Sequence, residues 1–180
     1  MVSRLPGDEH AAVYLPAPDR GGRERARFAG GLITAAVCDY RIAVADGARF
    51  GLNEVPIGIP MPAVYVRMLA YAWGEPVAAR TCLLGEVFSP AQAHTLGMVH
   101  ELAPAGELLD RAVAVAELTP EDCLGQYAFT KRACRASALR DIAELADLLD
   151  GELPDGMTSD HARHAHRRYW QQLKGSPAPW

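Results

Sequence analysis

The chain has 180 residues, a hydrophobic fraction of 49% and a charged fraction of 22%, values typical of one soluble globular domain. Its net charge of −4 gives no reason to expect nucleic acid as a partner, and no run of 18 apolar residues predicts a membrane helix. We therefore expect a cytoplasmic protein. The cysteines are widely spaced, which favours reduced core cysteines over zinc ligands or disulfides; they are Cys38, Cys82, Cys123 and Cys134.

Residues 1–28 are rich in proline, glycine and arginine, a composition typical of a flexible leader. Within them the pattern predicts one short strand, at 11–14. A binding arm is the alternative interpretation of this segment. At the other end of the chain, residues 176–180 are expected to form a tail.

A glycine turn opens the stretch 29–60, where the clearest site pattern lies. Gly30 and Gly31 allow a close approach of the backbone to a ligand, and the apolar run 32–37 predicts a buried helix. The first N–H groups of a helix have no acceptors within the helix and lie at the positive end of its dipole. Gly30 therefore marks a possible site for negative charge. The alternative is a turn that lets the helix pack on a sheet.

Two short strands and a carboxylate follow this helix. Residues 40–44 and 49–52 are predicted strands, and Asp46-Gly47 between them predicts a tight turn. Glu54 comes at the end of the second strand. Backbone donors and a lone carboxylate suit the abstraction of a proton next to a carbonyl group. The alternative for Glu54 is a solvated surface carboxylate.

Downstream, the positions of glycine, proline and capping residues predict further helices and one strand. The helices are expected at 61–72, 76–84, from Ser89-Pro90 to Gly97, at 107–118, 121–135, 139–149, and at 160–173 behind the cap Ser159; the strand is expected at 98–102. The chain thus divides into an α/β core at 29–103 and a helical C-terminal region at 104–175.

Four segments carry a family resemblance: GG-x6-CDYRIA, ARFGLNEV-x-IG, FSPAQAHTLGMV and SDHARHAHRRYWQQLKG. They resemble the crotonase superfamily of enoyl-CoA hydratases and isomerases, and the Δ3,Δ2-enoyl-CoA isomerases most closely. The resemblance covers about 29–175 and implies a partial spiral of ββα turns. In the family, several strands and a first oxyanion loop precede the glycine turn, and residues 1–28 do not resemble them. We therefore expect the N-terminal third of the domain to be missing.

The resemblance implies a role for each matching residue. Gly30 would donate its backbone N–H to a thioester oxygen, and Glu54 would move the substrate proton. Apolar neighbours at 52, 55, 57 and 59 are expected to desolvate Glu54 and raise its pKa. Ile33 stands where hydratases of the family have a second glutamate. This substitution favours the shift of a double bond, which needs one base, over hydration.

The implied substrate is an acyl-CoA thioester, with coenzyme A as part of the substrate and no metal or other cofactor. Lys174 would contact a CoA phosphate; the alternative, for it and for Arg167-Arg168, is a solvated basic helix end that complements the helix dipole. The resemblance also implies a homo-oligomer, a trimer or hexamer. Missing strands would leave unpaired sheet edges and exposed apolar faces, so we expect either an oligomer with the last helices at the interface or a poorly soluble chain. Two alternatives stay open: an inactive crotonase-like remnant with an assembly role, and another acyl-CoA reaction such as hydration or hydrolysis.

The remaining polar and aromatic candidates are expected to be structural. Asp39 and Arg41 are predicted to pair at a strand start. The last helix carries three histidines that we interpret as surface residues rather than a metal site, and the helix at 61–72 with the tryptophan after it carries an apolar face that is core or, alternatively, an acyl pocket. These residues are His161, His164 and His166, and Tyr65, Met68 and Trp73.

Overall fold

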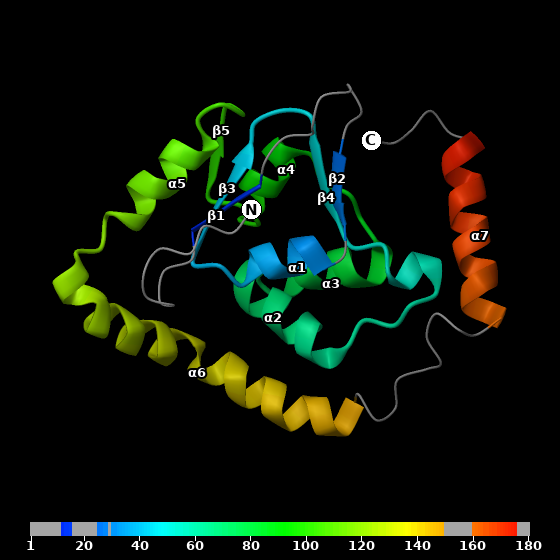
Figure 1. The fold of residues 1–180 in the computed structure, drawn as a ribbon. Helices are drawn as coiled ribbons and strands as arrows, with labels where there is room; N and C mark the ends of the chain where they lie inside the picture. The colour runs from blue at the N-terminus through cyan, green and yellow to red at the C-terminus, as the bar shows by residue number, and fades with distance from the viewer. Residues whose placement is uncertain (1–11, 16–24, 29, 150–159, 176–180) are drawn as a thin grey trace.

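The computed structural model describes residues 12–15, 25–28, 30–149 and 160–175 (Figure 1). Within these ranges the chain forms short parallel strands in its first part and helices throughout. In chain order the elements are β1 (Ala12–Leu15), β2 (Arg25–Phe28), α1 (Gly30–Ala36), β3 (Tyr40–Val44), β4 (Ala48–Gly51), the 3-10 helix η1 (Val55–Ile57), α2 (Ala63–Trp73), α3 (Glu75–Leu84), α4 (Pro90–Thr95), β5 (Glu101–Ala103), α5 (Leu108–Ala116), the 3-10 helix η2 (Glu121–Cys123), α6 (Leu124–Leu149) and α7 (Asp160–Gly175).

The strands form two small parallel sheets, ordered β1-β3-β5 and β2-β4. Ala12 lies opposite Tyr40 in the first sheet, and Arg25 lies opposite Ala48 in the second. The expectation of a single strand within residues 1–28 is therefore wrong, because β2 is a second one. Its sequence, Arg-Ala-Arg-Phe, has no β-branched residue, so its strand conformation depends on pairing with β4 rather than on local propensity.

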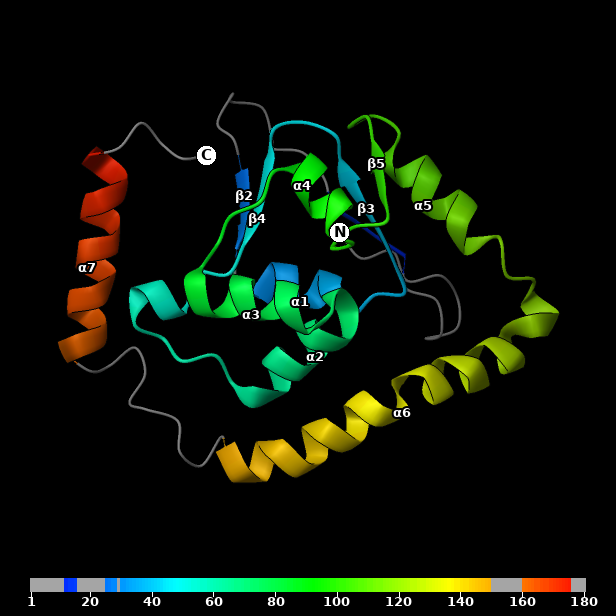
Figure 2. The ribbon, with the colours of Figure 1, turned by 180° about the vertical axis from the view of Figure 1, so that it is seen from behind.

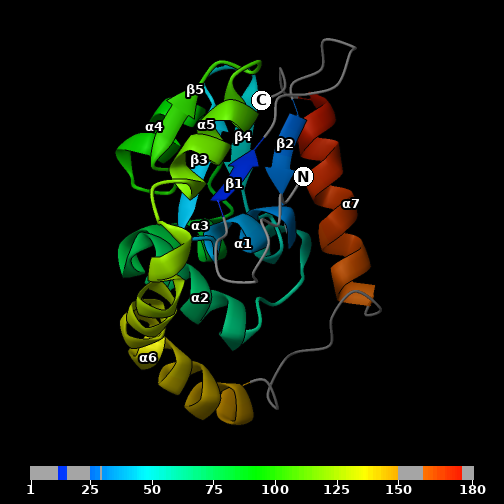
Figure 3. The same cartoon turned by 60° about the vertical axis from the view of Figure 1, so that its left-hand side comes forward.

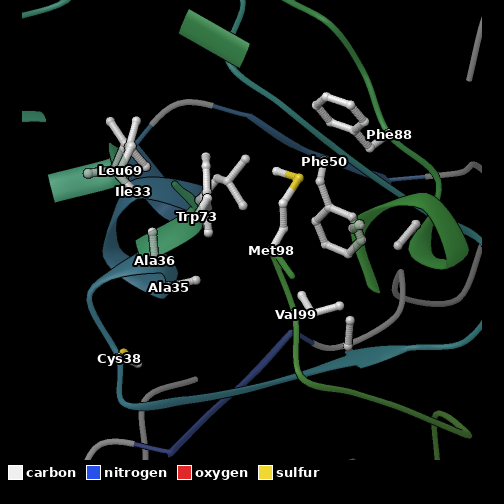
Figure 4. Close-up of a cluster of buried hydrophobic side chains, with 14 of the residues drawn as sticks. Ile33, Ala35, Ala36, Cys38, Phe50, Leu69, Trp73, Phe88, Met98 and Val99 are labelled. Carbon is white, nitrogen blue, oxygen red and sulfur yellow. The ribbon is translucent and has the colours of Figure 1, made fainter. Parts of the chain in front are cut away.

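The core lies between the sheets and the helices α1, α2 and α3. Phe50 and Phe88 are almost fully buried and pair through two backbone hydrogen bonds, of 3.0 and 2.9 Å. Figure 4 shows their rings beside Met98, with Trp73 and Leu69 on the helical side. The expected turn between β3 and β4 is confirmed, since Gly47 has the positive φ of 72° that a tight turn requires.

Glycine and serine end and begin the middle helices as expected. α2 ends before Gly74, and α3 ends at Gly85, which adopts the left-handed conformation. Ser89 caps α4 in a full capping box: its side chain accepts from the Gln92 N–H, and the Gln92 side chain accepts from the Ser89 N–H. The helix boundaries in this part of the chain agree with the prediction to within two residues.

The expectation of separate helices at 121–135 and 139–149 is wrong, because α6 runs unbroken from Leu124 to Leu149. The intervening Ala136-Ser137-Ala138 contains no glycine or proline, and alanine is the strongest helix former. Figures 2 and 3 show α6 running along α2, with α7 on another side of the molecule against η1. The predicted cap of α7, Ser159, lies outside the described residues.

Two of the four cysteines differ from the expectation. Cys38 and Cys82 are buried, as predicted for core cysteines, whereas Cys123 and Cys134 are exposed on η2 and α6. Among the described helices, none combines the length and apolar character needed to cross a bilayer.

Candidate functional site

Gly30 is the first residue of α1, which confirms the predicted glycine at a helix start. The next residue, Gly31, is exposed, and a Cβ added there would meet nothing within 4 Å. Packing therefore does not require glycine at 31, and the first turn of α1 has an open surface. In Figures 1 and 2 this end of α1 is directed towards the side of the molecule where η1 and α7 lie.

Ile33 is buried in the core, 7% exposed, and Figure 4 shows it beside Leu69. This side chain contributes to packing and supplies no ionisable group. A carboxylate in its place would have to be desolvated among aliphatic side chains at considerable cost. Of the other acidic side chains in the stretch 30–60, Asp39 is ion-paired and Asp46 is exposed, so Glu54 is the candidate base of this stretch.

Glu54 lies three residues beyond the end of β4 and immediately before η1. Its carbonyl oxygen accepts the N–H groups of Ile57 and Ile59, at 3.1 and 2.8 Å, so the backbone around it is closed into a tight turn. The side chain is half-buried, and its Oε2 atom is fully buried without a hydrogen-bond partner among the described residues. An unpaired carboxylate oxygen in this setting is unusual, because buried polar atoms are nearly always hydrogen-bonded.

Burial raises the pKa of Glu54 above its ordinary value, and a hydrogen bond from its own backbone partly offsets this effect. The expected direction of the shift is thus confirmed. The nearby thiol of Cys82, on α3, has its pKa raised to about 11 by burial and, to a smaller extent, by the charge of Glu54. The Glu54 carboxylate therefore lies within electrostatic range of α3.

The end of α3 holds the turn that carries Glu54. A Cβ added to Gly85 would lie 2.5 Å from Cγ of Pro56 and 3.3 Å from the carbonyl oxygen of Leu52. Only glycine tolerates this approach, and its φ of +61° requires glycine as well. η1 therefore packs directly against the C-terminal end of α3, and this contact fixes the backbone on both sides of Glu54.

The last helix also meets this turn. α7 packs on η1, and Tyr169 is hydrogen-bonded to Asn53, the residue before Glu54. Burial raises the pKa of Tyr169. Sequence reasoning missed this residue, because nothing in the local pattern relates a tyrosine in α7 to a turn more than a hundred positions earlier. Lys174 lies in the same helix, but its side chain is outside the described part, while Arg167 and Arg168 are exposed.

Asp39 and Arg41 do not form the predicted pair. Asp39 is bound instead by α6: Arg135 donates to Oδ1 at 2.6 Å, Tyr127 donates to Oδ2 at 2.8 Å, and Lys131 forms an ion pair with Oδ2. The Arg41 guanidinium is buried and donates to backbone carbonyls, the shortest bond being 2.7 Å to Met98. The other carbonyls are those of Ala36, Cys38, Ala72 and Gly97. Both side chains are structural, as expected, but with different partners.

The apolar face of α2 is divided between core and surface. Trp73 is buried in the core, whereas Tyr65 is 39% exposed. Met68 lines an apolar cavity of about 350 Å³ between α2 and α6. The three residues therefore do not line one pocket. On α7, His164 is exposed, and the side chains of His161 and His166 lie outside the described residues.

Comparisons with known proteins identify the family to which the sequence and the fold are similar. A family model described as "Enoyl-CoA hydratase/isomerase" matches residues 25–174. Mitochondrial enoyl-CoA delta isomerase 1 of Mus musculus is 38% identical over 89 residues, which cover 48% of this chain and 30% of that protein. Mitochondrial enoyl-CoA hydratase domain-containing protein 2 of Homo sapiens is 28% identical over 157 residues, covering 87% of this chain and 53% of that protein.

Solved structures show the same fold. An enoyl-CoA hydratase/isomerase from Pseudoalteromonas atlantica superposes with a TM-score of 0.70 at 18% identity, over 82% of this chain and 59% of its own. A family protein from Pseudomonas syringae superposes with a TM-score of 0.62 at 26% identity, over 68% and 53%. The chain spans less than two thirds of the length of the curated relatives that it matches. The model match, which spans most of the chain, and the shared partial α/β crotonase fold together establish that this chain belongs to the enoyl-CoA hydratase/isomerase family.

Proposed function

We propose that this chain shifts a double bond in an enoyl-CoA thioester, with Glu54 as the single proton shuttle. The observation that carries the proposal is the state of the Glu54 carboxylate, whose Oε2 is buried and without a partner among the described residues. A structural carboxylate would be paired, whereas a general base must keep an oxygen available for the substrate proton. The raised pKa of Glu54 further strengthens it as a base.

The isomerisation needs one base that acts twice. In the proposed cycle Glu54 removes a proton from C2 of a 3-enoyl thioester, electrons shift to form an enolate, and the same carboxyl group returns the proton at C4. The thioester carbonyl acidifies C2, and the Gly30 N–H donates to the enolate oxygen. Loss of one such donor in other enzymes lowers the rate about 10²–10³-fold. Coenzyme A enters this proposal as part of the substrate, with Lys174 on α7 as the contact to a CoA phosphate.

Ile33 supports isomerisation over hydration. Addition of water needs one group that deprotonates the water and another that delivers a proton to carbon. The buried isoleucine supplies neither. We also propose that the chain works as a homo-oligomer, because α6 exposes Phe129 and Leu148, at 67% and 61%, which an interface would cover.

The test is conversion of 3-enoyl-CoA to 2-enoyl-CoA by the purified chain and by Glu54→Gln. We expect the substitution to lower kcat by about 10²–10⁴-fold, because the amide cannot accept the proton. Glu144→Gln on α6, where the glutamate is exposed, is the matched control and should leave the rate unchanged. Activity that survives Glu54→Gln would overturn the role of Glu54. If the unaltered chain binds acyl-CoA without turnover, the non-catalytic alternative is favoured instead.

A further inference from the structure

Two cavities lie along the contact between α2 and α6, and neither is lined by Glu54. The first, which we call the cationic cavity, has a volume of about 440 Å³ and lies between the end of α1, the start of β3, the end of α2 and the first half of α6. The second, the apolar groove, is the cavity of about 350 Å³ between α2 and α6. Tyr71 and Arg135 line both, so the two cavities adjoin. Each is within the range of about 300–1,000 Å³ found for small-molecule sites.

The cationic cavity carries an excess of positive charge. Arg41, Lys131 and Arg135 line it together with a single carboxylate, that of Asp39. With His100 neutral, these four side chains give the lining a net formal charge of +2. A concave surface with one sign of charge concentrates the field and attracts ligands of the opposite sign. The ligand that fits this wall is an anion.

The side chain of His100 supplies a donor that faces another donor. The backbone N–H of Arg41 donates to Nδ1 of His100 at 3.0 Å, so Nδ1 is an acceptor. Burial and the Arg41 charge lower the pKa of His100, which keeps the ring neutral, and its proton is then on Nε2. Nε2 lies 3.2 Å from Nη2 of Arg41, which is also a donor. An anionic oxygen at this wall of the cavity would accept the hydrogen bond of His100 Nε2, which otherwise faces only the donor of Arg41.

Arg135 stands where the two cavities meet. Its Nη2 donates to the carbonyl oxygen of Val37 at 2.7 Å and to Oδ1 of Asp39 at 2.6 Å. Among the described residues no hydrogen bond is formed by its Nε or Nη1 atoms. A guanidinium presents its donors in a planar fork that matches a carboxylate. The unoccupied edge of Arg135 can therefore hold an anionic head group while Asp39 fixes the other edge.

The apolar groove extends from Arg135 along the facing sides of α2 and α6. Its other lining residues are Val37, Val64, Met68, Tyr71, Ala138, Leu139 and Ile142. Leu139 is 57% exposed, so aliphatic surface at the groove is in contact with water. A hydrocarbon chain placed here would cover that surface and gain the free energy of apolar burial.

We propose that the cationic cavity and the apolar groove together bind a single-chain amphipathic anion of the fatty-acid class. The carboxylate head would lie against Arg135, and the hydrocarbon tail would follow the groove between α2 and α6. The cationic cavity and the apolar groove specify the ligand jointly. An inorganic anion would make no use of the groove, and an uncharged lipid would make no use of the cations. The site is separate from Glu54 and does not depend on the function proposed for that residue.

The test is isothermal titration calorimetry of the full 180-residue chain with dodecanoate below its micelle concentration. We expect saturable binding of one molecule per chain, weakened at least about tenfold by Arg135→Gln and by Leu139→Glu. The first removes the cation at the head position, and the second places a like charge in the groove without altering the Asp39 ion pairs. The matched controls are Arg132→Gln on α6 and Leu83→Glu on α3, two exposed residues outside both cavities, and they should leave the affinity unchanged.

Two further ligands separate the contributions of head and tail. Acetate and dodecanol should each bind at least about tenfold more weakly than dodecanoate, because each lacks one half of the ligand. The proposal is overturned if dodecanoate shows no saturable binding, if dodecanol or acetate binds as tightly, or if the control variants lose as much affinity as Arg135→Gln. An equal loss in Glu54→Gln would also overturn it, since the ligand would then occupy the Glu54 site.

Discussion

Two carboxylates in the first half of the chain have opposite surroundings. Asp39, between α1 and β3, receives donors from three side chains of α6, and both of its oxygens are paired. Glu54, before η1, has one buried oxygen without a partner among the described residues. The fold pairs both oxygens of the first carboxylate and leaves one oxygen of the second without a partner among the described residues. A protein tolerates such an unpaired group at a cost in stability, so the contrast points to structure at Asp39 and to chemistry at Glu54.

The contrast between the two carboxylates can be tested by substitution, and the largest loss of stability is expected for Asp39→Asn. The substitution leaves Lys131 and Arg135 without their common partner, and we expect it to lower the free energy of unfolding by about 2–3 kcal/mol. Glu54→Gln should change it by less than about 1 kcal/mol, because the amide oxygen can still accept the hydrogen bond from the backbone of residue 54. Urea denaturation of the two variants measures the difference. Equal destabilisation by both would show that Glu54 is a structural residue.

A smaller effect is expected where α3 supports the Glu54 turn. Gly85→Ala introduces both left-handed strain and a contact with Pro56, and we expect a loss of about 2 kcal/mol in stability together with reduced isomerase activity. Gly47→Ala is the matched control: its φ of +72° is similar, but an added Cβ meets nothing within 4 Å. It should cost about 1 kcal/mol from strain alone and leave activity intact. Equal losses of stability and activity in the two variants would contradict the packing of η1 against α3.

The smallest effect is a pH dependence of stability that comes from Glu54. Its raised pKa means that the folded chain holds the proton to higher pH than the unfolded chain does. Stability due to this group therefore falls as pH rises from the ordinary value of 4.5 to the raised folded value, and it is constant above that interval. We compare the urea midpoints of the wild-type chain and Glu54→Gln from about pH 4 to about pH 8. The midpoint of the wild-type chain should fall relative to that of Glu54→Gln as pH rises to the raised pKa, and the difference should then stay constant. Parallel curves would show that the pKa is not raised.

Local signals predicted most elements and part of the site. The positions of Gly74, Gly85 and Ser89 bounded three helices because their backbone and capping preferences act within a few residues. The raised pKa of Glu54 was predictable for a similar reason, since the apolar residues at 52, 55, 57 and 59 lie within five positions of it in the sequence. α6 was divided wrongly, although residues 136–138 contain no glycine or proline that would break a helix.

Contacts between distant segments were beyond local reasoning. The partners of Asp39 come from α6, about ninety positions later, and no spacing rule identifies them. The same holds for Tyr169 beside Asn53 and for the pairing of β2 with β4. Such contacts are set by how helices pack on the sheets. The candidate base Glu54 was therefore visible in the sequence, whereas the contact of α7 with its turn was not.

The most direct test of the account is the pKa of the Glu54 carboxyl group, measured by ¹³C NMR titration with the resonance assigned by its loss in Glu54→Gln. The account predicts a value above the ordinary 4.5, because the carboxylate is desolvated and one oxygen has no partner. A value at or below 4.5 would show that Glu54 is solvated or paired, and it would contradict a role for Glu54 as the base.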